Sequence, residues 1–476
     1  MNPLGHTPGR TPIVAVAVAL LCLAGPAWPG AAQPGVAQPG NRPPGVPPPV
    51  DLAALPTPAS VNTLPYVVHN AVTQQTGPVQ QQAPCPRLAA ERDRDLQAEP
   101  EAQQLLRIQK AQTYATGRGQ LVAVIDSGVQ PHSRLVPRLI DGGDYIENRD
   151  GLFDCDGHGT AVAGLIAAAP DKTTGFVGVA PAATILSIRQ ASTFYTVPLR
   201  QLDTGQHSDS PSAGDTVSMA QAVLRAVQLK ATVINISEAA CFPAQPDQDK
   251  APDLQAAVHY AVENNVVVVV AAANTSPTCR QNSPGVVTTI SSPGWFTDDV
   301  LAVAATDDEG KPAPFSLHGP WVDVAAPGTG AISLAAGRPG LTGKLLDARG
   351  VAHPLDGTSF ATPYVAGLAA LVRERFPNLT ARQVMHRIER TARGSHRTAD
   401  LGYGMIDPVA ALSTVLPEEQ ATQAQPIGPP AKRDAPRAPA PERAVALVGS
   451  AIALGALGLA MVVVQTIKRQ RRHPGQ

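Results

Sequence analysis

The run Leu121-Val122-Ala123-Val124-Ile125, which leads into Asp126, is the first of five apolar stretches that indicate how this chain folds. The other strand-like runs lie at 184–189, 232–237, 266–273 and 300–305. Helical periodicity fills three windows between them, at 159–169, 215–230 and 253–265. Strands that alternate with helices in this way form parallel sheets covered on both faces. We therefore expect an α/β fold with a mainly parallel central sheet and helices on both faces.

Three short motifs, far apart in the chain, supply a carboxylate, an imidazole and a hydroxyl. Asp126 precedes Ser-Gly, His158 lies in Asp-Gly-His-Gly-Thr, and Ser359 lies in Gly-Thr-Ser-Phe-Ala-Thr-Pro. An imidazole can take the proton of a serine hydroxyl, and a buried carboxylate holds that imidazole in the tautomer it needs. The order Asp, His, Ser is one of three chain orders in which this chemistry recurs on unrelated folds. The motifs therefore predict a hydrolase that cleaves peptide bonds.

These motifs resemble those of the subtilisin-like serine proteases, the subtilases, over roughly residues 100–415. Residues 266–274 are similar to the subtilase strand that ends in the oxyanion asparagine, here Asn274. The resemblance implies a subtilisin-like fold in which Ser359 attacks the scissile carbonyl while His158, oriented by Asp126, acts as base and then as acid. It also implies that Asn274 and the backbone N–H of Ser359 stabilise the oxyanion.

One position departs from the subtilase pattern. Subtilases usually carry glycine immediately before the oxyanion asparagine, whereas this chain has Ala273. If the backbone at that position has a positive φ, the Cβ of alanine costs about 1–2 kcal/mol. That strain would fall next to Asn274, whose amide must be aimed at the reacting carbonyl.

Within the subtilases, the chain is most similar to the mycosins, the membrane-anchored subtilases of type VII secretion systems. The shared features are a signal peptide, a proline-rich extension that bears a cysteine, a C-terminal transmembrane helix, and Cys155 three residues before His158. The resemblance implies protein or peptide substrates and contacts with membrane-complex components of a type VII secretion system. A second hypothesis is that the domain is a structural scaffold of that complex, with proteolysis dispensable.

Both ends of the chain carry membrane or export signals. Arg10 and the apolar residues 13–24 predict a secretory signal peptide. The 24 residues of 444–467 carry no charge, and as a helix they span the hydrocarbon core of about 30 Å. The alternative for this run is a buried core helix. Because the basic cluster that follows stays cytoplasmic by the positive-inside rule, we expect a single-pass type I protein of the cell membrane with its peptidase domain on the extracytoplasmic, periplasmic side.

These patterns divide the chain into six segments. Residues 33–60 hold nine prolines and should be extended, and the stalk before the membrane helix is proline-rich as well. The expected segments are the signal peptide 1–32, the Pro/Gln-rich N-terminal extension 33–99, the peptidase domain 100–416, the stalk 417–443, the transmembrane helix 444–467 and the basic cytoplasmic tail 468–476.

Cleavage of the signal peptide removes Cys22 and leaves Cys85, Cys155, Cys241 and Cys279. An even count in an exported protein favours two disulfides, for which three pairings exist, and four buried thiols are the alternative. Cys241 and Cys279 follow neighbouring parallel strands and would lie in loops at one sheet edge, so they can pair. That leaves Cys85–Cys155, a pair that the mycosin resemblance also implies.

Several other features argue against further functions. The 37 basic and 38 acidic residues create no basic field, so we expect no nucleic-acid partner. We also expect no cofactor and no metal, because His158 alone among eleven histidines has a catalytic context and none shows metal-ligand spacing. Residues 154–159 mimic the opening of a calcium loop, but Leu165 stands where a bidentate glutamate is needed.

Three local patterns complete the predictions. Glu238 lies where subtilases pair with an extended substrate, and it either favours a basic substrate side chain or is an exposed strand-end residue. The polar stretch 191–213 lacks periodicity and is expected to be a mobile surface loop. Thr380 and Gln383 form a capping box that should open a last amphipathic helix, 381–393.

Overall fold

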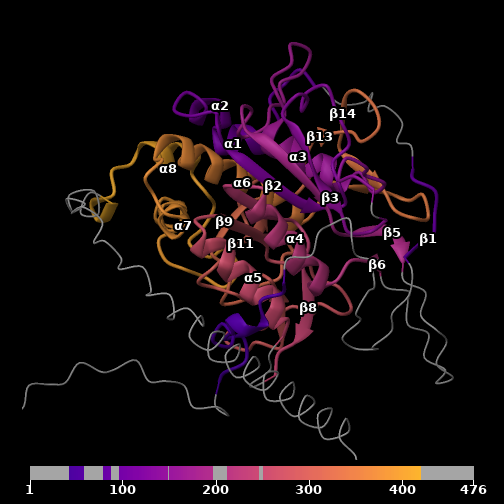
Figure 1. The fold of residues 1–476 in the computed structure, drawn as a ribbon. Coiled ribbons are helices and arrows are strands. Elements are labelled where there is room, and N and C mark those ends of the chain that lie inside the picture. Colours follow the sequence, from indigo (N-terminus) through magenta and orange to yellow (C-terminus); the bar gives the residue numbers. More distant parts are fainter. Residues whose placement is uncertain are drawn as a thin grey trace, which may run out of the picture. The chain divides into compact units, whose positions relative to one another are not determined.

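The structure is a computed structural model that describes residues 42–57, 79–86, 96–147, 149–196, 212–245 and 250–419 (Figure 1). The expected signal peptide, transmembrane helix and cytoplasmic tail lie outside these residues, as does nearly all of the stalk. Within the described ranges, no helix is long and apolar enough to cross a membrane. The chain divides into two compact units, 1–414 and 415–476, and every element described below belongs to the first.

A seven-stranded sheet forms the centre of this unit, and all neighbouring strands in it are parallel, in the order β12-β11-β9-β7-β2-β4-β3. The strands are β2 (Leu121–Asp126), β3 (Leu139–Asp144), β4 (Thr184–Arg189), β7 (Val233–Ile236), β9 (Val267–Ala271), β11 (Leu301–Thr306) and β12 (Val324–Pro327). Every residue of β7, β9, β11 and β12 is buried. Continuous apolar runs suit these strands because helices flank the sheet and leave little of it to solvent.

Two pairs of helices pack on the sheet. α6 (Thr358–Arg375) lies along β7, β9, β11 and β12 and packs against α3 (His158–Ala167). α4 (Thr216–Gln228) and α5 (Pro252–Glu263) pack against each other, and α4 also packs on β2 and β4 and α5 on β9. Nearly all residues of α3 and α6 are buried, which explains why their sequences are apolar on every face. The shorter helices are the 3-10 turn η1 (Leu52–Ala54), α1 (Glu101–Leu106), α2 (Ile108–Ala111) and α8 (Pro408–Ser413).

The last amphipathic helix is α7 (Ala381–Arg390). Its capping box forms as predicted, because Thr380 Oγ1 accepts from the N–H of Gln383 and Gln383 Oε1 accepts from the N–H of Thr380. The helix ends three residues before the predicted boundary, at Arg390.

Two disulfides tie surface segments to the domain. Cys241 is bonded to Cys279 and Cys85 is bonded to Cys155. Cys241 lies in a short strand, β8, and not in the expected loop. The Cys85–Cys155 bond holds the N-terminal extension next to the segment that carries His158. The small sheets pair β8 (Ala240–Pro243) with β10 (Thr289–Ser292), β5 (Ser192–Thr196) with β1 (Gln80–Gln81) and β6 (Ser212–Ala213), β13 (Ser333–Leu334) with β14 (Leu341–Thr342), and β15 (Lys344–Leu346) with β16 (Ala352–Pro354).

Three features of the fold differ from the sequence-based expectation. β3 and β12 were not predicted, because they are the two edge strands of the sheet and their sequences are interrupted by Gly-Gly and Pro. The loop prediction for 191–213 was wrong at both ends, which form β5 and β6, while residues 197–211 lie outside the described ranges. The β-branched and aromatic residues of Ser-Thr-Phe-Tyr-Thr at 192–196 favour a strand and could have indicated β5.

Candidate active site

A hydrogen bond joins the carboxylate of Asp126 to the imidazole of His158. Asp126 is the last residue of β2 and fully buried, and His158 is the first residue of α3. His158 Nδ1 lies 2.7 Å from Asp126 Oδ1, which also accepts from the N–H of Ser127 at 2.7 Å. Because an ionised carboxylate can only accept, Nδ1 carries the proton and Nε2 of the neutral ring remains free to act as a base.

The surroundings of His158 favour its protonated form. Burial lowers the pKa of His158, but the charge and hydrogen bond of Asp126, with the charges of Glu238 and Asp154, outweigh burial and raise that pKa to about 10. The ring of Phe360 lies beside the imidazole, with the centroids 5.1 Å apart. An imidazolium formed by uptake of a serine proton is therefore stabilised in place.

A second buried carboxylate, Asp154, shapes the segment that presents His158. Asp154 Oδ1 accepts from Ser127 Oγ at 2.9 Å and from the N–H of Gly157 at 2.8 Å. Asp154 Oδ2 accepts from the N–H of Thr160 at 2.9 Å and from its hydroxyl. Burial raises the pKa of Asp154 to about 7. Both oxygens of Asp154 thus accept hydrogen bonds from the residues around His158 and fix that segment, an arrangement called the Asp154 clamp below. The spacing of the motif in the sequence did not reveal this role.

Ser359 is the second residue of α6 and opens into a cleft of about 340 Å³ that His158 and Asn274 also line. Gly357 separates the hydroxyl of Ser359 from the amide of Asn274. A Cβ at Gly357 would lie 2.8 Å from Ser359 Oγ and 3.1 Å from Asn274 Nδ2. Only glycine keeps this space open, because real Cβ atoms do not approach other atoms so closely. The structure thus places His158, Asn274 and Ser359 at one cleft, and Asp126 is bonded to His158 from the buried side.

The amide of Asn274, which follows β9, is fixed by the residue before Ser359. Asn274 Oδ1 accepts from the N–H of Thr358 at 2.9 Å and from its hydroxyl at 3.0 Å. With the oxygen held by Thr358, the amide N–H₂ faces the space beside Gly357 and Ser359. Donors fixed in such a position can stabilise negative charge that develops on a carbonyl oxygen.

Ala273 has a φ of 90°, so the backbone before Asn274 does have the positive φ that glycine would favour at this position. Alanine in this left-handed region is strained by its Cβ. Neighbouring segments hold the residue in place, because the carbonyl of Ala273 accepts from the N–H of Leu317 at 2.9 Å and Asn274 bridges to Ser316. Asn274 keeps both of its bonds to Thr358 despite this strain.

Glu238 faces the imidazole from the side of the substrate cleft. Its Oε1 lies 3.9 Å from His158 Nδ1, and its side chain is 40% exposed. It lines both the cleft at Ser359 and an adjoining cavity of about 190 Å³. Partial burial raises the pKa of Glu238, opposed by the charge of His158 and assisted by the charges of Asp126 and Asp156. The residue is therefore electrostatically coupled to His158 and is more than an exposed strand end.

In the described part of the chain, one group of side chains lies close enough together to share a metal ion. It consists of Asp126, His158 and Glu238, whose ligand atoms lie within 4.8 Å of one another. Because Asp126 Oδ1 already accepts the proton of His158 Nδ1 at 2.7 Å, we assign these two atoms to orientation of the imidazole and not to metal binding.

Comparison with known proteins finds relatives over most of the chain. Residues 117–406 match the peptidase S8 or subtilase family. The chain is 41% identical over 443 residues to Mycosin-4 of Mycobacterium tuberculosis (strain ATCC 25618 / H37Rv), covering 90% of this chain and 94% of that protein. It is 40% identical over 390 residues to Mycosin-1 of Mycolicibacterium smegmatis (strain ATCC 700084 / mc(2)155), covering 78% of this chain and 86% of that protein.

Solved structures show the same likeness. The MycP3 protease from the type VII (ESX-3) secretion system is 40% identical, with a TM-score of 0.67 over 78% of this chain and 100% of that one. A chain in the intact ESX-5 inner membrane complex is 34% identical, with a TM-score of 0.68 over 89% of this chain and 99% of that one. The described sheet and its flanking helices are thus a subtilisin-like α/β fold.

Proposed function

Because this chain belongs to the mycosins, a group within the subtilase family of serine proteases, we propose that it is a membrane-anchored endopeptidase of a type VII secretion system. Peptide bonds are hydrolysed through Asp126, His158 and Ser359 by way of an acyl-enzyme. The observation that carries this proposal is the 2.7 Å bond between Asp126 and His158 beside the cleft that holds Ser359.

Acylation begins when His158 Nε2 takes the proton of Ser359 as its Oγ attacks the scissile carbonyl carbon. Asp126 keeps the proton on Nδ1 and stabilises the imidazolium that results. The tetrahedral oxyanion accepts from Asn274 Nδ2 and from the N–H of Ser359, at the N-terminus of α6, where the helix dipole also favours negative charge.

Collapse of the tetrahedral intermediate breaks the peptide C–N bond. His158 gives its proton to the departing amine, which leaves Ser359 as an ester of the substrate's acyl half. A water molecule then attacks the ester with His158 as the base, and the ester bond breaks. The product carboxylic acid and the Ser359 hydroxyl are released.

The proposed location of the protein is supported by its sequence and its relatives. We place a single membrane span at 444–467, outside the described residues, with the peptidase domain on the periplasmic side. A chain in the periplasmic assembly of the ESX-5 inner membrane complex is 36% identical to this one, with a TM-score of 0.68. That likeness supports a position in an equivalent complex.

Hydrolysis by purified protein tests the proposed activity. We expect the full chain in detergent to cleave fluorescein-labelled casein, and Ser359→Ala to lower the rate by at least about 10⁴. The matched control is Ser413→Ala, an exposed serine at the end of α8. An equal rate for wild type and Ser359→Ala would overturn the assignment of the nucleophile.

A scaffold role is the second candidate, favoured by the likeness to a chain within an assembled membrane complex over 89% of this sequence. Complementation of secretion by Ser359→Ala separates the two roles. Full rescue means that the domain supports assembly without chemistry, whereas no rescue by a variant that still joins the complex means that proteolysis is required.

A further inference from the structure

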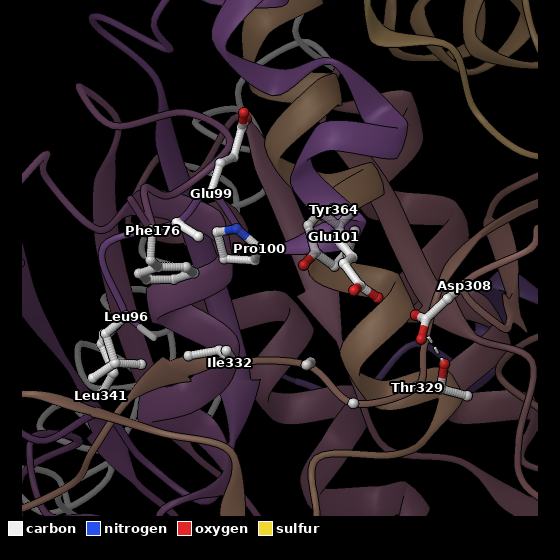
Figure 2. A pocket seen from close by; sticks show the side chains of 14 residues that line it. Leu96, Glu99, Pro100, Glu101, Phe176, Asp308, Thr329, Ile332, Leu341 and Tyr364 are labelled. Carbon is white, nitrogen blue, oxygen red and sulfur yellow. Dashed lines mark hydrogen bonds between the residues drawn. The ribbon is translucent and has the colours of Figure 1, made fainter. Parts of the chain in front are cut away.

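A cavity of about 290 Å³ lies apart from the cleft at Ser359, and no member of the triad lines it. It forms where the segment leading into α1 meets the loop after β11, the loop before β13 and the middle of α6 (Figure 2). Proteolysis as proposed above makes no use of this cavity, so its lining calls for a separate explanation.

One side of the cavity is apolar. Among its lining residues, Phe176 and Leu341 are buried in the core of the domain. The apolar side chains on this wall are Leu96, Pro100, Phe176, Ile332 and Leu341. A surface of this kind suits the methylene chain of a long side chain, whose polar end can then reach further groups.

The other side of the cavity is acidic. Glu101 of α1 and Asp308 of the loop after β11 lie near each other there, and Thr329 Oγ1 donates to Asp308 at 3.5 Å (Figure 2). The described residues that line the cavity include no lysine, arginine or histidine. Glu101 and Asp308 are both exposed at the rim, and the partial burial of Asp308, and after it the charge of Glu101, raises the pKa of Asp308. This direction is typical of carboxylates that lack a cationic partner.

Tyr364 supplies an independent sign that something binds here. Its side chain is 1% exposed and projects into the cavity beside Glu101 (Figure 2). In the part of the chain that the structure describes, the hydroxyl of Tyr364 makes no hydrogen bond, and it is open to the cavity. This hydroxyl is therefore placed to bind a polar group that comes from outside.

The carboxylates of this cavity do not belong to a group of three acidic, histidine or cysteine ligands that could share a metal ion. In the described part of the chain the one such group is the Asp126 cluster. A guanidinium group is broader, stays charged, and carries five N–H donors in a fixed plane that can reach separate acceptors.

We propose that this cavity receives an arginine side chain of a partner protein in the secretion membrane complex. The guanidinium lies against Glu101 and Asp308, one of its N–H groups donates to Tyr364, and its methylenes lie on the apolar wall. The choice of partner rests on the proposed function, whereas recognition of the arginine side chain does not.

Binding of a single-residue probe tests the recognition. Nα-acetyl-arginine methylamide is titrated into the full chain in nanodiscs, with Ser359→Ala present to prevent self-cleavage, and heats are compared with those of the citrulline analogue. Citrulline keeps the shape of arginine but is neutral. We expect at least tenfold tighter binding of the arginine probe. Equal binding of the two probes, or no binding of either, would overturn the proposal.

Variants locate the bound probe. We expect the double variant Glu101→Gln/Asp308→Asn to weaken binding of the arginine probe at least tenfold and Tyr364→Phe to weaken it about threefold. Glu309→Gln is the matched control, since it removes an exposed charge next to Asp308 that does not line the cavity. Unchanged affinity in the double variant would contradict the assignment.

The partner is tested in cells. We expect Glu101→Gln/Asp308→Asn to reduce the amount of this chain that co-migrates with the secretion membrane complex on a native gel. Hydrolysis of labelled casein by the same purified variant should stay at the wild-type rate, which separates this result from any failure of the proposed protease. Normal co-migration would show that no arginine of that complex uses the cavity.

Discussion

The amide oxygen of Asn274 accepts two hydrogen bonds from Thr358, the residue directly before Ser359. A side chain that follows β9 is thereby tied to the N-terminus of α6, across 84 positions of sequence. Because the oxygen is held, the amide nitrogen can only turn toward the space beside Gly357, where an oxyanion would form. The contact joins the proposed nucleophile and the proposed oxyanion donor in one rigid unit.

Substitution of the proposed oxyanion donor tests this unit. We expect Asn274→Ala to lower kcat by about 10²–10³, the usual effect of removing one oxyanion donor, with a smaller effect on KM. Thr358→Val removes only the hydroxyl bond and keeps the N–H bond, so its loss should be smaller. An undiminished kcat for Asn274→Ala in steady-state hydrolysis would rule out the role assigned to this amide.

The bond between Asp126 and His158 predicts a tautomer effect. Asp126→Asn keeps the shape of the side chain but presents an N–H₂ that can turn toward Nδ1 and place the imidazole proton on Nε2. We expect kcat to fall about 10⁴-fold, the scale of such a tautomer error in other triads. The circular dichroism spectrum should not change. A loss below tenfold would mean that Asp126 does not set the tautomer.

The charges around His158 predict an activity profile displaced to high pH. The imidazole must be neutral to accept the serine proton, and its pKa is raised from 6.5 to about 10. We therefore expect kcat/KM, which reports groups of the free enzyme, to keep rising from about pH 7 to about pH 9. A profile that levels off near pH 6.5 would contradict this expectation.

Glu238→Gln should move that profile in a defined direction. The substitution removes a negative charge 3.9 Å from Nδ1, and that charge stabilises the imidazolium. Without it the pKa of His158 falls, so the rising limb of kcat/KM should shift to lower pH. Asp347→Asn, which also removes a charge that lines the adjoining cavity, is the control. A shift to higher pH for Glu238→Gln would refute the coupling.

The φ of 90° at Ala273 predicts a stabilising substitution. Glycine adopts this conformation without a Cβ clash, so we expect Ala273→Gly to raise the free energy of unfolding by about 1 kcal/mol after its larger unfolded-state entropy is included. Urea unfolding of the two proteins measures the difference. Ala272→Gly, at a buried neighbour without positive φ, should instead destabilise, and a destabilised Ala273→Gly would show that Ala273 carries no strain.

The sequence predicted the core of the fold, and it suggested the proposed triad, because both depend on local patterns. The apolar run 121–125 predicted β2 and placed Asp126 at its end, where parallel strands direct their functional groups. The Asp154 clamp and the Thr358–Asn274 contact were not predicted, since each joins atoms whose approach is set only by tertiary packing. The edge strands β3 and β12 were missed because an edge strand tolerates glycine and proline that would weaken a central one.

The most direct test of the account is reaction of the purified full chain with a fluorophosphonate probe, followed by mass spectrometry of its peptides. Such probes react with a serine only when a neighbouring base has activated it. We expect a single adduct on Ser359, formed faster as pH rises and absent from Ser359→Ala. An adduct on a different serine, or none at a pH where His158 is neutral, would contradict it.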